Sequence, residues 1–162
     1  MVRIPHSHHK LLEGQQFTVN RSAQIQTNDT ANLWIQNPEK SRKTLVVDTL
    51  VVRVDSAAVG KYYQDPDASG GSVTWSTNDL IGGGKSTVAK VRQDVEFSNF
   101  RVSTQFPLSA ADNTGKGFSE RPPVALAEGA TLGIEVTSRE DTNDILILAT
   151  FYETDRSASH VR

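Results

Sequence analysis

The stretch DLIGGGKSTV at residues 79–88 contains the residue types of a phosphate-binding loop. Such a loop has the pattern G-x-x-x-x-G-K-[ST], in which backbone amides cradle the phosphates and the lysine reaches them. Gly84, Lys85 and Ser86 match its end, but Asp79 stands where the first glycine belongs. A carboxylate there would repel a phosphate, and the alternating residues that follow predict a strand where the motif needs a helix. We therefore interpret the stretch as an inter-strand loop.

The histidines could in principle serve a metal or a hydrolase, and all of them lie at the chain ends: His6, His8, His9 and His160. Imidazole groups bind zinc and copper, but the N-terminal cluster has no acid or cysteine close by, so we expect no metal. A catalytic histidine is normally fixed on the scaffold between a nucleophile and an orienting group. The distribution therefore argues against a serine-type hydrolase.

The acidic residues offer two further kinds of site. The Asp-rich segments 65–71 and 138–144 do not follow the calcium-loop pattern, and aspartate is a good turn residue, so both are interpreted as turns. Glu96, Glu135 and Glu153 fall on predicted strands. Two opposed carboxylates would suit a glycosidase, and this alternative stays open beside the commoner case of solvated strand surfaces. We predict no catalytic residue and no cofactor.

Composition narrows the class of protein. The chain has 162 residues, no cysteine, and 17 Lys plus Arg against 19 Asp plus Glu. This length fits one domain, and the balanced charge predicts no nucleic-acid partner. No apolar run approaches the roughly 20 residues that span a bilayer, so no membrane span is predicted. The N-terminus lacks the apolar segment of a signal peptide, so we expect the mature chain to start near Met1.

Hydrophobic periodicity of two dominates the sequence and predicts an all-β protein. Within one segment, Ala31, Leu33 and Ile35 share a face and Trp34 points the other way. In the last segment both faces are apolar, so we expect that strand to be covered on both sides. We predict about seven or eight strands, in the segments 15–26, 31–36, 43–56, 72–77, 86–106 (one strand or two), 130–138 and 143–154.

The remaining segments set the expected boundaries. Residues 138–144 are predicted to turn a hairpin that joins the last two strands. Residues 55–65, interrupted by Gly60, have room for one helical turn. Residues 120–126 are expected to be irregular because Pro122-Pro123 excludes ladder pairing. The predicted organisation is an N-terminal arm over 1–12, a β-sandwich over 13–154 and a C-terminal tail over 155–162.

Two stretches resemble a known group of proteins. LWIQNPEKSRKTLVVDTLVVRVDS (33–56) and GATLGIEVTSREDTNDILILATFYET (129–154) are similar to the opening strands and closing hairpin of small viral and phage virion structural proteins. The resemblance implies a jelly-roll capsid, penton or head-decoration protein with a single antiparallel β-sandwich of eight strands and flexible polar arms. It implies a non-enzymatic protein of the virion that contacts its own copies and other capsid proteins, with peripheral proximity to a viral membrane possible.

Several residues are candidates for these subunit contacts, on the arms, loops and outward aromatic positions: Arg3, His6, His8, His9, Trp34, Tyr62, Tyr63, Trp75, Lys85 and Arg156. The contact loops are expected at 65–71, 81–86 and 111–123. The alternative is a carbohydrate- or receptor-binding sandwich, in which Trp34, Tyr62, Tyr63 and Trp75 form a stacking platform. A glycosidase-like or nucleotide-dependent enzyme is the third hypothesis.

Overall fold

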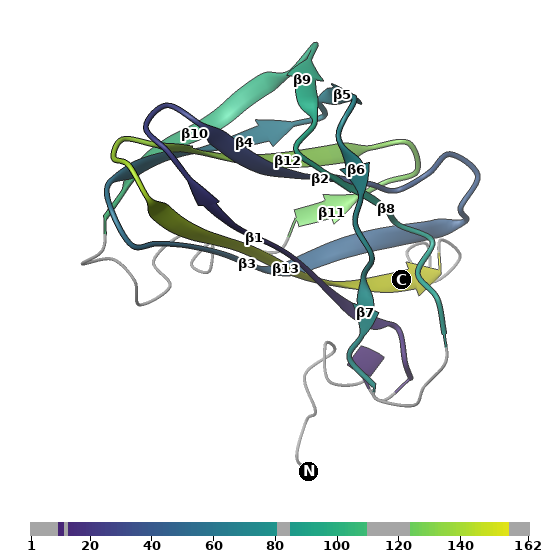
Figure 1. Ribbon diagram of the computed structural model, residues 1–162. Coiled ribbons are helices and arrows are strands. Elements are labelled where there is room, and N and C mark those ends of the chain that lie inside the picture. The colour runs from purple at the N-terminus through teal and green to yellow at the C-terminus, as the bar shows by residue number, and fades with distance from the viewer. Residues whose placement is uncertain (1–9, 12, 81–84, 110–123, 156–162) are drawn as a thin grey trace.

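The computed structural model describes residues 10–11, 13–80, 85–109 and 124–155. They form two facing antiparallel sheets and a separate two-stranded ribbon (Figure 1). The sandwich is built from eight strands: β1 (Gln16–Ile25), β2 (Thr30–Gln36), β3 (Lys43–Val54), β4 (Ala58–Gln64), β10 (Arg101–Leu108), β11 (Val124–Leu126), β12 (Thr131–Ser138) and β13 (Asn143–Asp155). The predicted all-β antiparallel sandwich is therefore confirmed.

The strand order is that of a jelly roll. One sheet has the order β11-β3-β13-β1 and the other the order β10-β4-β12-β2, each extended at one edge by shorter strands. A jelly roll can be described as one long hairpin that is wound into two layers. The antiparallel pairs expected of such a hairpin are present: β1–β13, β2–β12, β3–β11 and β4–β10. Eight strands in two packed sheets define this architecture.

Alternating side chains from both sheets fill the space between the layers. In β13, Ile145, Ile147, Ala149 and Phe151 are all buried, and the Phe151 ring stacks on Phe17 of β1 with ring centroids 5.6 Å apart. In β2, the predicted core face of Ala31, Leu33 and Ile35 is confirmed. The opposite face of β13 is half-buried rather than covered, because it forms the outer surface of its sheet.

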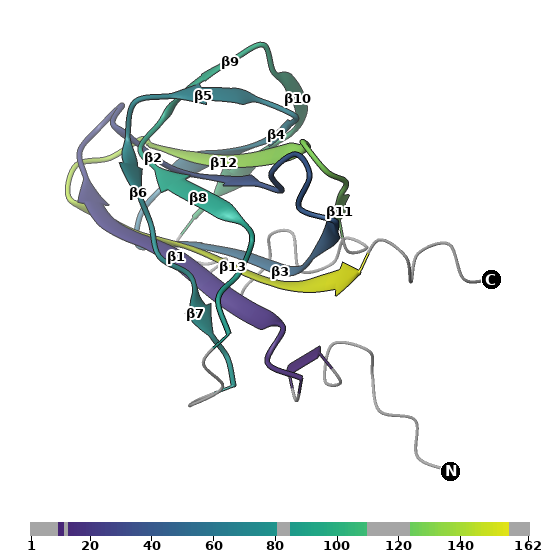
Figure 2. The ribbon, with the colours of Figure 1, turned by 90° about the vertical axis from the view of Figure 1, so that its right-hand side faces the viewer.

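The chain between β4 and β10 forms an insert, residues 65–80 and 85–100 among those described. It contains β5 (Asp67–Ser69), β6 (Ser72–Val73), β7 (Thr77–Asn78), β8 (Lys90–Gln93) and β9 (Glu96–Ser98). Strands β8 and β6 extend the β2 sheet, whereas β7 extends the β1 sheet. The insert therefore passes from one layer to the other along the open edge of the sandwich (Figure 2). The ribbon β5–β9 lies above the sheet that contains β4 and β12 (Figure 1).

The ribbon is seated on the outer face of this sheet by aromatic packing at a glycine. Trp34, Gly133 and Tyr63 are cross-strand neighbours on β2, β12 and β4. The Phe97 ring lies over Gly133, where a Cβ would come within 2.7 Å of it, and its centroid is 4.8 Å from that of Tyr63. Trp34 donates its Nε1 hydrogen to the Pro66 carbonyl at 3.1 Å. The outward aromatic side chains are thus covered by the insert of the same chain.

Three buried asparagines hold the loops to the sheets. Asn32 forms a two-bond pair with Val95 of the insert, its amide donating to the carbonyl at 2.8 Å and its oxygen accepting the N–H at 2.9 Å. Asn37 donates to the carbonyls of Lys43 and Leu126. Asn143 accepts the N–H groups of two residues after β3 and donates to the Ser138 hydroxyl. Because buried backbone groups need partners, these side chains replace ladder bonds where the strands end.

Three segments without a predicted strand form strands, and one of them is β5 within the predicted turn at 65–71. Residues 58–64 are β4 and not a helical turn, because Gly60 makes room for the Phe106 ring of the neighbouring strand rather than interrupting a helix. Residues 124–126 form β11, which pairs with β3 directly after the two prolines. Strand β11 pairs with β3, which is distant in the sequence, so the local proline content does not reveal this pairing.

The predicted closing hairpin is wrong. Residues 138–144 do turn the chain, but β12 pairs with β2 and β4 whereas β13 pairs with β1 and β3. The turn therefore crosses between the two sheets. Likewise, the single long segment predicted over 86–106 is divided among β8, β9 and β10. In the first case the partner strands differ from the predicted pairing, and in the second three strands replace the predicted one or two.

The packing at Gly133 gives a first prediction. We expect Gly133→Ala to lower the free energy of unfolding by about 1–3 kcal/mol, because the new methyl group overlaps the Phe97 ring. Urea unfolding measures this change. In a double-mutant cycle, Phe97→Leu should recover part of the loss because it removes the ring that the methyl group displaces. A Gly133→Ala variant as stable as the parent protein would show that the ring is not seated there.

Candidate functional site

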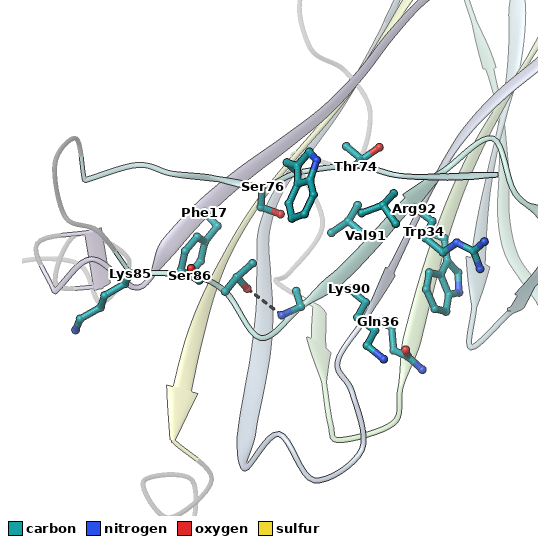
Figure 3. A pocket seen from close by; sticks show the side chains of 14 residues that line it. Phe17, Trp34, Gln36, Thr74, Ser76, Lys85, Ser86, Lys90, Val91 and Arg92 are labelled. Atoms are coloured by element: carbon teal, nitrogen blue, oxygen red, sulfur yellow. Dashed lines mark hydrogen bonds between the residues drawn. The ribbon is translucent and has the colours of Figure 1, made fainter. Parts of the chain in front are cut away.

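A cleft opens where the insert crosses the edge of the sandwich. This edge cleft has a volume of about 620 Å³ and is lined by Phe17, Trp34, Gln36 and residues 73–76, 85–87 and 89–92. Figure 3 shows these side chains gathered around it from both sheets and from the insert. The volume lies within the range of roughly 300–1,000 Å³ that is typical of small-molecule sites.

The first wall of the edge cleft, residues 73–76, is anchored at both ends. At one end, Thr74 donates its N–H to the Val91 carbonyl at 3.0 Å, just after the pairing of β6 with β8. At the other end, β7 pairs with β1, and the Asp79 carboxylate accepts hydrogen bonds from Gln16 and Thr18. The wall therefore bridges the two sheets.

The second wall, residues 85–89, is held by a carboxylate from the opposite sheet. Glu153 of β13 has only 5% of its surface exposed. It accepts the Thr87 hydroxyl at 2.6 Å and the Val88 N–H at 2.7 Å. Thr87 in turn accepts the N–H of Ala89, the bond drawn in Figure 3. An ionised acceptor forms stronger hydrogen bonds than a neutral one, so Glu153 fixes the course of this wall.

The charge of the edge cleft is positive. Lys85, Lys90 and Arg92 line it, and no acidic side chain does. Lys85 donates to the Glu13 carbonyl at 2.9 Å and Arg92 donates to the Gly70 carbonyl, both of which are neutral acceptors. Within the described part of the chain, no ion pair involves any of the three cations. None of the three cations is therefore paired with a carboxylate of the described residues.

Three large apolar side chains of the insert are exposed, and two of them lie at the edge cleft. Trp75 has 86% of its surface exposed, Val73 63% and Phe100 45%, and all three belong to the insert. Trp75 and Val73 line the edge cleft. Close by, the buried hydroxyl of Ser76 has no hydrogen-bond partner among the described residues. A buried polar group without a partner is uncommon and marks a place where a ligand or water can bind.

The structure separates the predicted contact residues into three groups. Trp75 and Lys85 lie together in the edge cleft, with Trp34 in its lining. Tyr62 is buried in the core, and Tyr63 is covered by Phe97 and Phe100. The remaining candidates lie outside the described residues: Arg3, His6, His8, His9 and Arg156. The stacking platform of four aromatic rings is not formed, because Trp75 is the one exposed ring of that set.

Sequence reasoning missed Lys90 and Arg92. They occupy alternate positions of β8, opposite Gln36 and Trp34 of β2. Alternation in the segment KVR places both cations on one face of a strand, and this was the available signal. Their approach to Trp34 depends on the pairing of β2 with β8, which are far apart in the sequence.

The other sites suggested by sequence motifs have structural explanations. The glycines 82–84 lie outside the described residues, but β7 and irregular residues flank them, and neither side supplies the helix that a phosphate loop needs. Glu135 accepts the Tyr63 hydroxyl at 3.1 Å on the sheet opposite to that of Glu153. Glu96 is exposed on β9. These carboxylates do not face one another across a common site.

Neither a metal centre nor a membrane-spanning helix is found among the described residues. They contain no group of three or more His, Cys, Asp or Glu side chains placed to hold a metal ion. They also contain no helix with the length and apolar character needed to cross a membrane.

The fold and site together define an all-β jelly-roll sandwich with an aromatic and basic cleft at one edge. No protein-family model, curated protein or solved structure matches the chain. A fold of this type serves many functions, so the site and not the fold indicates what this protein does.

Glu153 gives the second prediction. We expect Glu153→Ala to lower the free energy of unfolding by about 1.5–3 kcal/mol, because it removes two hydrogen bonds to a charged acceptor and leaves the Val88 N–H unpaired. Urea unfolding measures the loss, and amide hydrogen exchange at Val88 should become faster. Glu153→Gln keeps an acceptor oxygen and should lose less. Unchanged exchange at Val88 in the alanine variant would contradict the assigned role.

Tyr63 gives the third prediction, on pH dependence. Burial, followed by the charge of Glu135 and its hydrogen bond, raises the pKa of Tyr63 above its usual value of 10.0. The unfolded chain therefore ionises this tyrosine first, and the stability that it contributes is lost as the pH rises above about 10. Urea midpoints measured from neutral to alkaline pH should fall less steeply for Tyr63→Phe than for the parent protein. Identical slopes would contradict the assignment.

Proposed function

We propose that the protein is a non-enzymatic virion structural protein that assembles into or onto a viral capsid through contacts with its own copies and other capsid proteins. The observation that carries the proposal is that the strongly exposed large apolar side chains lie on the insert of a jelly roll. Among the described residues, every large apolar side chain that is strongly exposed lies there: Val73, Trp75 and Phe100.

Burial against a partner would stabilise these side chains. Val73 and Trp75 lie together at the edge cleft, and exposed apolar groups that adjoin mark protein contacts more often than singly scattered ones do. The insert is also held firmly by Asn32, Phe97 and Asp79, so little conformational entropy is lost when a partner binds it. Jelly rolls are used in capsid shells, where repetition under symmetry adds many copies of one contact. These features support a role in the virion.

The fourth prediction tests assembly. Size-exclusion chromatography with light scattering should give a discrete oligomer, and electron microscopy should show a closed ring or shell fragment. Phe100→Ser should shift the mass toward the monomer, because it removes exposed apolar area from the insert. Glu96→Gln, an exposed change on the same insert, should leave the mass unchanged. A strictly monomeric parent protein at all accessible concentrations would refute the proposal.

A second candidate function is supported by the edge cleft. Its size, its exposed Trp75 and its hydroxyl-bearing lining suit a carbohydrate-binding sandwich, in which a sugar ring stacks on an aromatic face. Jelly rolls also form lectin domains. In this candidate function Trp75 alone would stack the sugar, in place of the predicted platform of four rings.

A further inference from the structure

We propose that the edge cleft binds an acidic oligosaccharide, whose sugar ring stacks on Trp75 and whose carboxylate or sulfate groups contact Lys90, Arg92 and Lys85. The inference rests on the second candidate function, sugar binding by the jelly roll. It does not depend on shell assembly.

The charge of the cleft selects an anionic ligand. The chain as a whole carries a formal net charge of −2, yet three cations and no carboxylate line this one cleft. Lys85 and Arg92 are oriented by backbone carbonyls, which fix the side chains without neutralising them. Cations that are fixed in this way and form no ion pair with a described carboxylate attract an anion, and they lose little side-chain entropy when it binds.

The positions of the cations favour more than one anionic group. Lys90 and Arg92 are alternate residues of β8 and share a face with their partners Gln36 and Trp34. Lys85 lies at the other end of the cleft from Arg92, with Lys90 between them (Figure 3). A ligand that contacts the cations at both ends of the cleft must carry at least two separated anionic groups. An oligosaccharide of acidic units meets this requirement.

The uncharged lining suits a sugar. Trp75 presents an exposed aromatic face, which packs well against the C–H groups of a pyranose ring. Gln36, Thr74 and Ser86 provide amide and hydroxyl groups around it. The buried Ser76 hydroxyl, which has no partner among the described residues, can bond a sugar hydroxyl.

A single-stranded nucleic acid fits the cleft less well. Such strands are bound by a basic groove that follows the backbone and by several aromatic side chains that stack successive bases. Here one ring is strongly exposed at the cleft, since Phe17 and Trp34, which also line it, are buried. One stacking position with hydroxyl-binding groups matches a sugar better than a run of bases.

Titration of the full chain with defined probes tests the inference. The acidic probes are a heparin-derived tetrasaccharide and tetragalacturonate, and the neutral control is cellotetraose. The chain has two tryptophans, and Trp34 is buried, so fluorescence quenching reports mainly on Trp75. We expect the acidic probes to bind at least about tenfold more tightly than the neutral one, with an affinity that falls as salt rises.

Matched variants separate the contributions of the ring and the charges. Trp75→Ala and the double variant Lys90→Gln/Arg92→Gln should each weaken binding of the acidic probes about tenfold or more. Arg101→Gln/Arg139→Gln removes the same charge from exposed positions outside the cleft and should bind as the parent does. Circular dichroism and thermal melting confirm that each variant is folded. Equal weakening by both double variants would overturn the assignment to this cleft.

The remaining outcomes are distinguishable. Equal binding of the acidic and neutral probes would overturn the acidic ligand and leave the second candidate function intact. No binding of any saccharide at millimolar concentration would overturn both. Tighter binding of single-stranded oligothymidine than of the acidic probes would replace the sugar by a nucleic acid.

Discussion

The missing side chain at Gly133 is the constraint on which the outer half of the molecule depends. It leaves a slot between Trp34 and Tyr63 on the outer face of one sheet, and the Phe97 ring fills it. With Phe97 in place, the ribbon β5–β9 covers two aromatic residues that would otherwise face solvent. The ribbon thereby holds the insert on this sheet, and the strands β6 and β8 then extend the edge of the same sheet.

The insert forms the proposed binding surface at the edge of the sandwich. A sandwich whose edge strands are unpaired is open to pairing with other chains, and here β6, β7 and β8 extend both sheets at the same side. Hydrogen bonds of Asp79 and Glu153 hold the two walls, residues 73–76 and 85–89, in place, and the edge cleft lies between them. These two acidic groups bond hydroxyl, amide and backbone N–H donors on the insert and β1, and neither forms an ion pair with the cations of the cleft.

Both proposals therefore place function on the insert and leave the eight-stranded sandwich as its support. A shell contact would use the exposed apolar side chains, whereas an acidic sugar would use the cations and one face of Trp75. The two share Trp75, so a neighbour that covers this ring would compete with the ligand. This competition follows from the geometry of one short segment, residues 73–76.

Period-two alternation in the sequence was sufficient to predict the class of fold and the inward face of β2, since a strand exposes alternate residues to the same side. It did not predict strand partners: the turn at 138–144 crosses between sheets, and Gly60 admits Phe106 from a neighbouring strand. Nor did it predict the cleft, because the cleft depends on contacts between segments that are distant in the sequence. Trp34 lies opposite Arg92 through the pairing of β2 with β8, and Glu153 accepts a hydrogen bond from Thr87. Alternation encodes which side of a strand is buried, but the identity of the neighbouring strand depends on contacts that no local pattern contains.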